Sequence, residues 1–315
     1  MSLLDVRDLH IYFGSASNAV EVVSGLNFSI GESEIFGLAG ESGCGKSITA
    51  LSIMGILPRS AFAKGQIFFD GRDLLKLDEE SKRHLRGNKM SMVFQEPMTS
   101  LNPVLTIGYQ IAEVLVTHRG MSMKDASDRA IELLRSVKIP SPEVRIKEYP
   151  HQMSGGMRQR VMIAMAIACN PSLLIADEPT TALDVTIQAQ ILELVQNLRE
   201  EHKMSILFIT HDLGIIAENA SRVAIMYAGK LVELAQTSEM FSNPRHPYTI
   251  GLLESIPKGK GIPLKPISGN VPGPEDFPKG CRYIDRCSMK TGSCRGEETP
   301  FIEVSEGHFV RCGLT

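Results

Sequence analysis

The residues from Gly40 to Ser47 form a loop pattern that binds nucleotide phosphates. The stretch matches G-x-x-x-x-G-K-[ST]. Its glycines let the backbone wrap closely, so that N–H groups point at phosphate oxygens, and the helix that follows adds a partial positive charge. In this pattern Lys46 reaches the β- and γ-phosphates, and the Ser47 hydroxyl holds Mg²⁺. The predicted ATP-binding residues of this loop are Gly40, Ser42, Gly43, Cys44, Gly45, Lys46, Ser47 and Ile48, and no chemistry is assigned to the Cys44 thiol.

Two adjacent carboxylates, Asp177 and Glu178, follow the apolar run of residues 173–176. A buried parallel strand that ends in carboxylates places them at the edge of the sheet where phosphates bind. Neighbouring side chains on a strand point in opposite directions, so we expect different roles. Asp177 is predicted to bind Mg²⁺ through water, and Glu178 to deprotonate the attacking water. The alternative, a solvated acidic strand end, is disfavoured by the phosphate loop upstream.

Gln95 and His211 each follow a predicted strand. Both should therefore lie at the same edge of the sheet as the two carboxylates. Gln95 suits a contact to Mg²⁺ or water, and His211 suits a contact to the γ-phosphate. Each residue type alone is more often structural, and only their shared position favours a catalytic role.

The stretch Ser154-Gly155-Gly156 precedes a helical run. It predicts a second anion-binding helix N-terminus, although a flexible turn is the alternative. Within one chain this turn is expected to lie far from Lys46.

Strands alternating with helices predict an α/β fold with a mainly parallel sheet. A helix is expected over 46–57, directly after the glycine loop, and another over 186–203, while 97–170 has the 3.6-residue apolar period of a mainly helical subdomain. The predicted strands are 3–13, 34–39, 66–69, 90–94, 172–176, 206–210 and 223–227.

The composition is that of an ordinary globular chain. Of the 315 residues 43% are hydrophobic and 22% charged, and the net charge of −3 gives no support for nucleic acid as a partner. Apolar runs are too short for a membrane span, and residues 1–10 lack a signal-peptide pattern, so we expect a cytoplasmic chain.

The motifs together resemble the ATPase subunit of an ATP-binding cassette (ABC) transporter over residues 1 to about 240. Ser154-Gly155-Gly156 is similar to the family signature L-S-G-G-Q, with Met153 and Met157 in place of Leu and Gln. The resemblance implies a P-loop NTPase fold with an N-terminal antiparallel β part, and a signature that closes over ATP held by a second cassette. It also implies that Ala182-Leu183-Asp184 is the D-loop at the dimer interface and that Phe13, rather than Tyr12, stacks on adenine.

Two further segments resemble the dipeptide and oligopeptide importers. They are residues 94–103, at the Q-loop, and His246-Pro247-Tyr248-Thr249. The resemblance implies a peripheral ATPase on the cytoplasmic face of the inner membrane. Its partners would be a paralogous ATPase in a heterodimer, two permease subunits and an extracytoplasmic solute-binding protein. Import of a nickel chelate or another solute is an alternative, as is a soluble, non-transport ABC ATPase, although this chain has one cassette and no sustained heptads.

The C-terminal segment 241–315 is predicted to be a separate, loop-rich appendix, because more than half of the 17 prolines lie from Pro244 onward. Residues 257–278 are expected to hold no regular structure. Four cysteines in a wide C-x₅-C-x₆-C-x₁₇-C pattern suit a [4Fe–4S] cluster better than Zn²⁺, whose structural sites usually contain close cysteine pairs. The tail also resembles that of importer ATPases that carry such a cluster. Zinc, free thiols and disulfides are the alternatives for Cys281, Cys287, Cys294 and Cys312.

Overall fold

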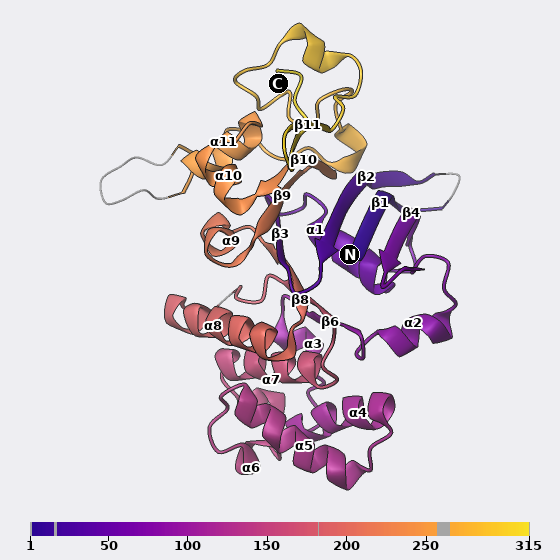
Figure 1. The fold of residues 1–315 in the computed structure, drawn as a ribbon, viewed down its shortest axis with the longest axis vertical. Helices are drawn as coiled ribbons and strands as arrows, with labels where there is room; N and C mark the ends of the chain where they lie inside the picture. The colour runs from indigo at the N-terminus through magenta and orange to yellow at the C-terminus, as the bar shows by residue number, and fades with distance from the viewer. Residues whose placement is uncertain (1, 16–17, 182, 257–264, 315) are drawn as a thin grey trace. The chain divides into compact units, whose positions relative to one another are not determined.

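Figure 1 shows the computed structural model, which describes residues 2–15, 18–181, 183–256 and 265–314. The chain forms two compact units: the first contains Met1–Lys76 and Phe208–Thr315, and the second contains Leu77–Leu207. Strands and helices alternate in both, so the predicted α/β class is confirmed. The units divide the chain differently from the expected boundary near residue 240, which stays a prediction.

An antiparallel sheet occupies the N-terminal part of the first unit. Its strands, in spatial order, are β2 (Val20–Gly31), β1 (Ser2–Phe13), β4 (Ala61–Phe69) and β5 (Arg72–Asp73). In β1 the apolar side chains are the buried ones, which explains why this strand could be predicted from its alternating pattern. The predicted antiparallel β part is therefore present, and β2 and β5 were missed.

The phosphate loop belongs to a second group of strands in the first unit. β3 (Ile35–Ala39) runs parallel to β9 (Arg222–Tyr227), and β10 (Lys230–Gln236) pairs antiparallel with β9. All five residues of β3 are buried, as expected for a parallel strand with both faces covered. The helices of this region are α1 (Lys46–Met54), α9 (Leu213–Asn219), α10 (Thr237–Ser242) and α11 (Pro247–Glu254).

The C-terminal tail adds strands to the first unit. β11 (Ile302–Ser305) and β12 (His308–Val310) form a hairpin, and β12 pairs with β10. Two single turns of 3₁₀ helix, η2 (Pro274–Asp276) and η3 (Gly292–Arg295), lie between them and α11. The expectation of no regular structure over 257–278 is wrong for η2, because proline at its first position suits a short helical turn. Residues 257–264 lie outside the described residues.

The second unit contains the predicted helical subdomain. β6 (Met90–Val93) runs parallel to β7 (Leu173–Asp177), and α7 packs on β6. β8 (Ser205–Thr210) crosses the boundary between the units in sequence. The helices are α2 (Glu79–Leu85), α3 (Pro97–Ser100), α4 (Ile107–Arg119), α5 (Met123–Ser136), α6 (Pro142–Arg145), the 3₁₀ turn η1 (Pro150–Gln152), α7 (Gly155–Ile167) and α8 (Val185–His202).

Helix α5 illustrates why the apolar period was informative. Its N-terminus is capped by Ser122, whose hydroxyl accepts from the Asp125 N–H, and its buried residues repeat at helical spacing. Those buried residues are Ala126, Ala130, Leu133 and Leu134.

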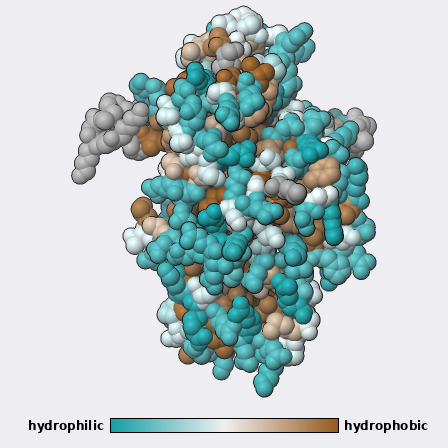
Figure 2. Space-filling model, viewed as in Figure 1, coloured by the Kyte–Doolittle hydropathy of each residue, from teal (hydrophilic) through white to brown (hydrophobic). Residues whose placement is uncertain are grey.

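The described helices include none that is both long and apolar enough to cross a bilayer. Figure 2 shows that, on one face, hydrophobic residues occur in scattered small groups among hydrophilic ones.

Candidate functional site

Close backbone packing requires glycine at two positions of the phosphate loop. A Cβ atom at Gly40 would lie 2.1 Å from the Met226 carbonyl oxygen in β9. Gly45, the residue before α1, has a φ of +110°, and a Cβ there would lie 2.6 Å from the Met226 Cε. β9 therefore fixes the path of the loop, and the predicted strand–loop–helix context is confirmed.

Lys46 is buried inside the loop that it belongs to. Its ammonium group donates to the carbonyl oxygens of Gly40, at 2.8 Å, and Glu41, at 3.0 Å. The loop therefore folds around the lysine ammonium, and two of its backbone carbonyl oxygens point at this cation. Burial raises the pKa of the Cys44 thiol, which keeps it protonated and agrees with assigning it no chemistry.

Two residues of the C-terminal part of the chain contact the phosphate loop, and no pattern in the sequence predicts these contacts. The Tyr248 hydroxyl accepts from the Glu41 N–H at 2.9 Å. The Arg286 guanidinium donates to both carboxylate oxygens of Glu41, at 2.6 and 3.0 Å. Tyr248 lies 207 residues and Arg286 lies 245 residues from Glu41 in the sequence. No local sequence pattern could therefore have predicted these contacts.

In the second unit, the structure brings Gln95 and Glu178 together. The Gln95 amide donates to the Glu178 carboxylate at 3.0 Å, and the Thr181 hydroxyl donates to the same oxygen at 2.9 Å. Gln95 lies two residues after β6 rather than directly at its end. The predicted proximity of the two side chains is present, whereas the contact with Thr181 was not predicted.

Asp177 and Glu178 differ in environment, as the strand pattern predicted. Asp177 is the last residue of β7 and is buried, whereas Glu178 is half-buried and has a φ of +47°. Such a backbone conformation is strained for a residue with a Cβ and recurs at functional sites. The buried oxygen donor of Asp177 and the exposed amide of Gln95 are the ligand types that Mg²⁺ prefers.

The Ser154-Gly155-Gly156 turn begins α7 as expected. The Ser154 hydroxyl accepts from the Met157 N–H at 3.4 Å, and Met153, which replaces the family leucine, is buried. A Cβ at Gly156 would lie 2.8 Å from the Ile187 Cγ2 of α8. Part of the glycine requirement is therefore packing within the second unit.

The predicted D-loop residue Asp184 caps α8, and its carboxylate accepts from the Ile187 N–H at 2.9 Å. Ala182 lies outside the described residues. This capping contact alone explains an aspartate at this position, and the interface role of Asp184 stays a prediction.

The remaining predicted residues lie in the first unit. Tyr12 stacks on Phe62 with ring centroids 5.2 Å apart, and the Lys64 ammonium lies over the Tyr12 ring, 5.4 Å from its centroid. Phe13, the last residue of β1, is half-buried. Because Tyr12 is engaged by its neighbours, Phe13 remains the better candidate for stacking on a base. His211 follows β8 and is exposed.

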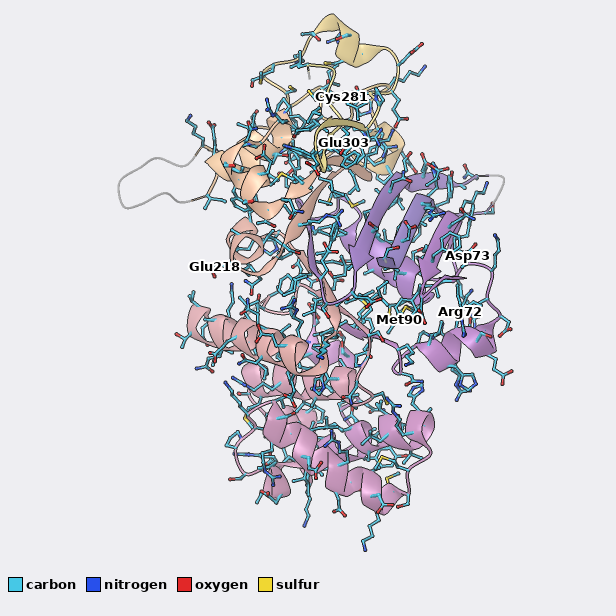
Figure 3. The ribbon with its side chains drawn as sticks, viewed as in Figure 1. Arg72, Asp73, Met90, Glu218, Cys281 and Glu303 are labelled. Atoms are coloured by element: carbon cyan, nitrogen blue, oxygen red, sulfur yellow. The ribbon has the colours of Figure 1, made fainter. Side chains whose placement is uncertain are left out.

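Cys281, which is labelled in Figure 3, interacts electrostatically with the other three tail cysteines, so the four thiols lie near one another. None of the six cysteines of the chain forms a disulfide. Burial raises the pKa of the Cys281 thiol, and the other three thiolates raise it further. The thiols of Cys287, Cys294 and Cys312 also interact with one another.

The chemistry of these thiols suits a metal centre, but their arrangement in space does not. Four sulfur ligands are the donor set of an iron–sulfur cluster. However, among the described residues no group of three or more His, Cys, Asp or Glu side chains is arranged to hold a metal ion. The geometry of the described residues therefore supports neither a zinc ion nor an iron–sulfur cluster.

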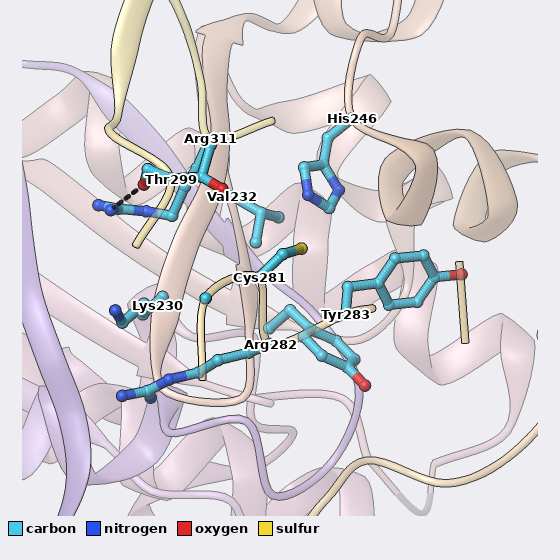
Figure 4. Close-up of a pocket in the computed structure, with 10 residues that line it drawn as sticks. Lys230, Val232, His246, Cys281, Arg282, Tyr283, Thr299 and Arg311 are labelled. Atoms are coloured by element: carbon cyan, nitrogen blue, oxygen red, sulfur yellow. Dashed lines mark hydrogen bonds between the residues drawn. The ribbon is translucent and has the colours of Figure 1, made fainter. Parts of the chain in front are cut away.

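A small cavity is lined by Cys281 and, among other residues, by the cations Lys230, Arg282 and Arg311 (Figure 4). Burial lowers the pKa of all three, that of Arg282 to about 10. Glu298 forms ion pairs with Lys230 and Arg311. The cations are thus compensated by the protein itself.

Comparisons with known protein families give two matches. Residues 23–181 match the ABC transporter family, and residues 232–294 match the oligopeptide/dipeptide transporter C-terminal region. The second match covers the segment that contains Tyr248, Arg286 and three of the four tail cysteines.

Similar proteins span nearly the whole chain. The oligopeptide transport ATP-binding protein AppD of Bacillus subtilis is 50% identical over 99% of this chain and 97% of its own length. The dipeptide transport ATP-binding protein DppD of Haemophilus influenzae is 49% identical over 99% of this chain and 95% of its own length.

Solved structures give the same family. A dimeric ATP-binding cassette in a post-hydrolysis state, bound to ADP and Pi, has a TM-score of 0.66 and 27% identity, covering 74% of this chain and 98% of that one. Another is cbiO1 of Clostridium perfringens, part of an ABC transporter complex, with a TM-score of 0.64 and 26% identity over 77% of this chain and 91% of that one.

Proposed function

This chain belongs to the ABC transporter family, and from that premise we propose that it is the ATP-hydrolysing subunit of an importer of dipeptides or oligopeptides. The observation that carries the proposal is similarity to peptide-transport ATPases at 49–50% identity along 99% of the chain, including the C-terminal region. A general P-loop enzyme would share the phosphate loop but not this tail.

The phosphate loop binds ATP in this proposal. Its N–H groups and the Lys46 ammonium receive the phosphates, which replace the carbonyl oxygens of Gly40 and Glu41 as partners of the lysine. Ser47 binds Mg²⁺ through its hydroxyl, and Phe13 stacks on the adenine. Bound Mg²⁺ neutralises charge on the phosphate oxygens.

Hydrolysis uses the groups at the ends of β6, β7 and β8. Glu178 accepts a proton from the attacking water, and the contact at 3.0 Å from Gln95 orients its carboxylate. Asp177 and Gln95 are further ligands for Mg²⁺, and His211 donates to the γ-phosphate. The strained backbone at Glu178 supports this assignment because it separates the directions of the two adjacent carboxylates.

The active assembly contains a second cassette. Ser154, Gly155 and Gly156 act on ATP held by the partner, and Asp184 lies at the interface between them. We propose a paralogous ATPase as that partner, with two permease subunits and an extracytoplasmic solute-binding protein, and with this chain on the cytoplasmic face of the inner membrane. The main domain extends to about residue 240, and the tail follows it.

Uptake of labelled dipeptides and oligopeptides by cells that lack this chain tests the proposal. Wild-type chain should restore uptake, and Lys46→Ala should not, because the loop loses its cation. Equal uptake with and without the chain, across peptides that the cell uses, would refute the peptide substrate.

The tail cysteines hold a [4Fe–4S] cluster in this proposal. Support comes from the nearness of the four thiols and from the wide spacing of the cysteines along the sequence, which suits a cluster better than a single ion. When bound, the cluster supplies folding free energy to a proline-rich segment. The chain's own contribution is to deliver four thiolates, one of which, Cys281, lines the cavity that Figure 4 shows.

Anaerobic purification tests the cluster. The protein should be brown and contain about four irons and four sulfides per chain. Replacing any one of the four cysteines with Ser should remove the colour and loosen the tail. Colourless protein with one zinc, or metal-free protein with an ordered tail, would contradict the cluster.

A further inference from the structure

The acidic residue Glu41 stands within the loop that receives ATP. Each of its polar groups has a partner: the N–H donates to the Tyr248 hydroxyl, the carbonyl accepts from Lys46, and the carboxylate accepts from Arg286. Glu41 therefore links the C-terminal tail to the lysine that contacts the phosphates.

Arg286 is held rigidly for this contact. Its side chain is only 5% exposed, and its Nε donates to the Ser268 carbonyl oxygen at 2.9 Å. The guanidinium carbon lies 5.6 Å from the Tyr227 ring centroid and 5.9 Å from that of Tyr283. A planar guanidinium that packs against aromatic rings and forms two hydrogen bonds with one carboxylate has one preferred position.

Tyr248 is fixed by the same surroundings. It is fully buried, and its ring centroid lies 4.6 Å from that of Tyr227 and 5.3 Å from that of Tyr283. These three residues form a tyrosine cluster between β9, α11 and the cysteine-containing tail. The Glu41 N–H thus donates to a hydroxyl whose ring is held in place by its packing.

We propose that Arg286 is a positioning residue for the ATP site, which neutralises the Glu41 carboxylate and, with Tyr248, fixes the phosphate loop. This inference rests on the proposed ATP site. An unpaired carboxylate in this loop would repel the phosphates of ATP, and the pair with Arg286 removes that repulsion. Because Cys287 directly follows Arg286, order in the cysteine-containing tail is coupled to nucleotide affinity.

Equilibrium binding of ATP, ADP and AMP to the purified chain tests the proposal. Arg286→Gln should bind ATP about tenfold or more weakly, because a hydrogen-bonded charge pair is lost. The penalty should decrease from ATP to AMP as the phosphate charge decreases. Arg286→Lys should restore part of the affinity. Arg295→Gln, at an exposed arginine of the same tail, is the matched control and should bind ATP as the wild type does.

A double variant separates charge from folding. Glu41→Gln combined with Arg286→Gln removes the repelling carboxylate and should recover most of the ATP affinity lost in Arg286→Gln. A merely structural role for Arg286 predicts no recovery, and that result would overturn the proposal. Equal ATP affinities for Arg286→Gln and Arg295→Gln would overturn it as well. Failure of the wild-type chain to bind ATP would instead refute the proposed ATP site.

Discussion

At the end of β7, one residue in an unusual backbone conformation follows a buried carboxylate. Asp177 completes the strand, and Glu178 turns away from it with a φ of +47°. Its carboxylate then meets Gln95 and Thr181. The sequence predicted that the two carboxylates would differ, because strand neighbours alternate, but it could not predict the contact with Thr181, which depends on this turn.

Replacing Glu178 with Gln should separate binding from hydrolysis. The amide keeps the shape of the side chain but cannot accept the proton of water, so turnover in the assembled transporter should fall by ~10²–10⁴-fold while ATP binding persists. Glu201→Gln, at an exposed position just before the end of α8, is the control and should keep wild-type turnover. Near-normal ATPase activity of Glu178→Gln would remove the assignment of this residue as the base.

Gly156 should be more sensitive to substitution than its neighbour. Gly156→Ala forces a methyl group against Ile187 and should destabilise the chain by about 1–3 kcal/mol. Gly155→Ala, where the nearest atom is 3.6 Å away, should be tolerated. Thermal unfolding compares the two variants. Adding Ile187→Leu removes the branched methyl and should recover stability in Gly156→Ala, and no recovery would contradict the packing explanation.

The elements differ in how far the sequence could predict them. β3, β7 and α5 have the continuous or periodic apolar patterns of their structures, and they were predicted. β10 was not predicted, although six of its seven residues are buried. Its interior holds Glu233, a buried carboxylate that accepts from the N–H groups of Arg245 and His246 and contacts His308. Hydrogen-bond partners from distant segments offset the cost of burying this carboxylate. No local sequence pattern predicts those partners.

His246 should make the C-terminal part of the first unit acid-sensitive. Burial lowers its pKa to about 3, whereas the unfolded chain has the ordinary value of 6.5. Below pH 6.5 the unfolded state therefore binds a proton that the folded state does not, and stability should fall by about 1.4 kcal/mol per pH unit towards pH 3. The loss is absent above pH 6.5.

His246→Asn should remove this acid sensitivity. Asparagine can accept the Tyr248 N–H, as the His246 Nδ1 does, but it does not titrate. Urea unfolding at pH 7 and pH 5, followed by tyrosine fluorescence in this chain without tryptophan, measures the effect. The exposed His84→Asn is the control. The same pH dependence in wild type and His246→Asn would contradict the assignment.

At the scale of the whole molecule, the predicted ATPase groups are divided between two units. The first contains the phosphate loop, Phe13 and His211, and the second contains Glu178 and the Ser154 turn. These residues were predicted from short motifs, from their places after strands and, for Phe13, from the family resemblance, and their roles stay predictions. The contacts of the tail with Glu41 could not be predicted, since they join segments more than 200 residues apart and depend on side-chain packing.

The signature turn should act on the partner's ATP. In an assembled pair of cassettes, Ser154→Arg should impair the site whose phosphate loop belongs to the partner, because a bulky cation replaces the helix cap there. Lys46→Ala should impair the site formed by this chain's own loop. Nucleotide occupancy of each site, measured with each variant in turn, distinguishes the two. Loss at the same site in both variants would contradict the shared arrangement.

The ATPase rate of the purified chain, measured against its concentration and then with its partner cassette and permeases, tests the central claim most directly. The account predicts a low rate per chain that rises with concentration and rises strongly in the assembled complex, since each site needs a second cassette. A dilute monomer with full activity, independent of concentration and unchanged by the partner, would contradict it.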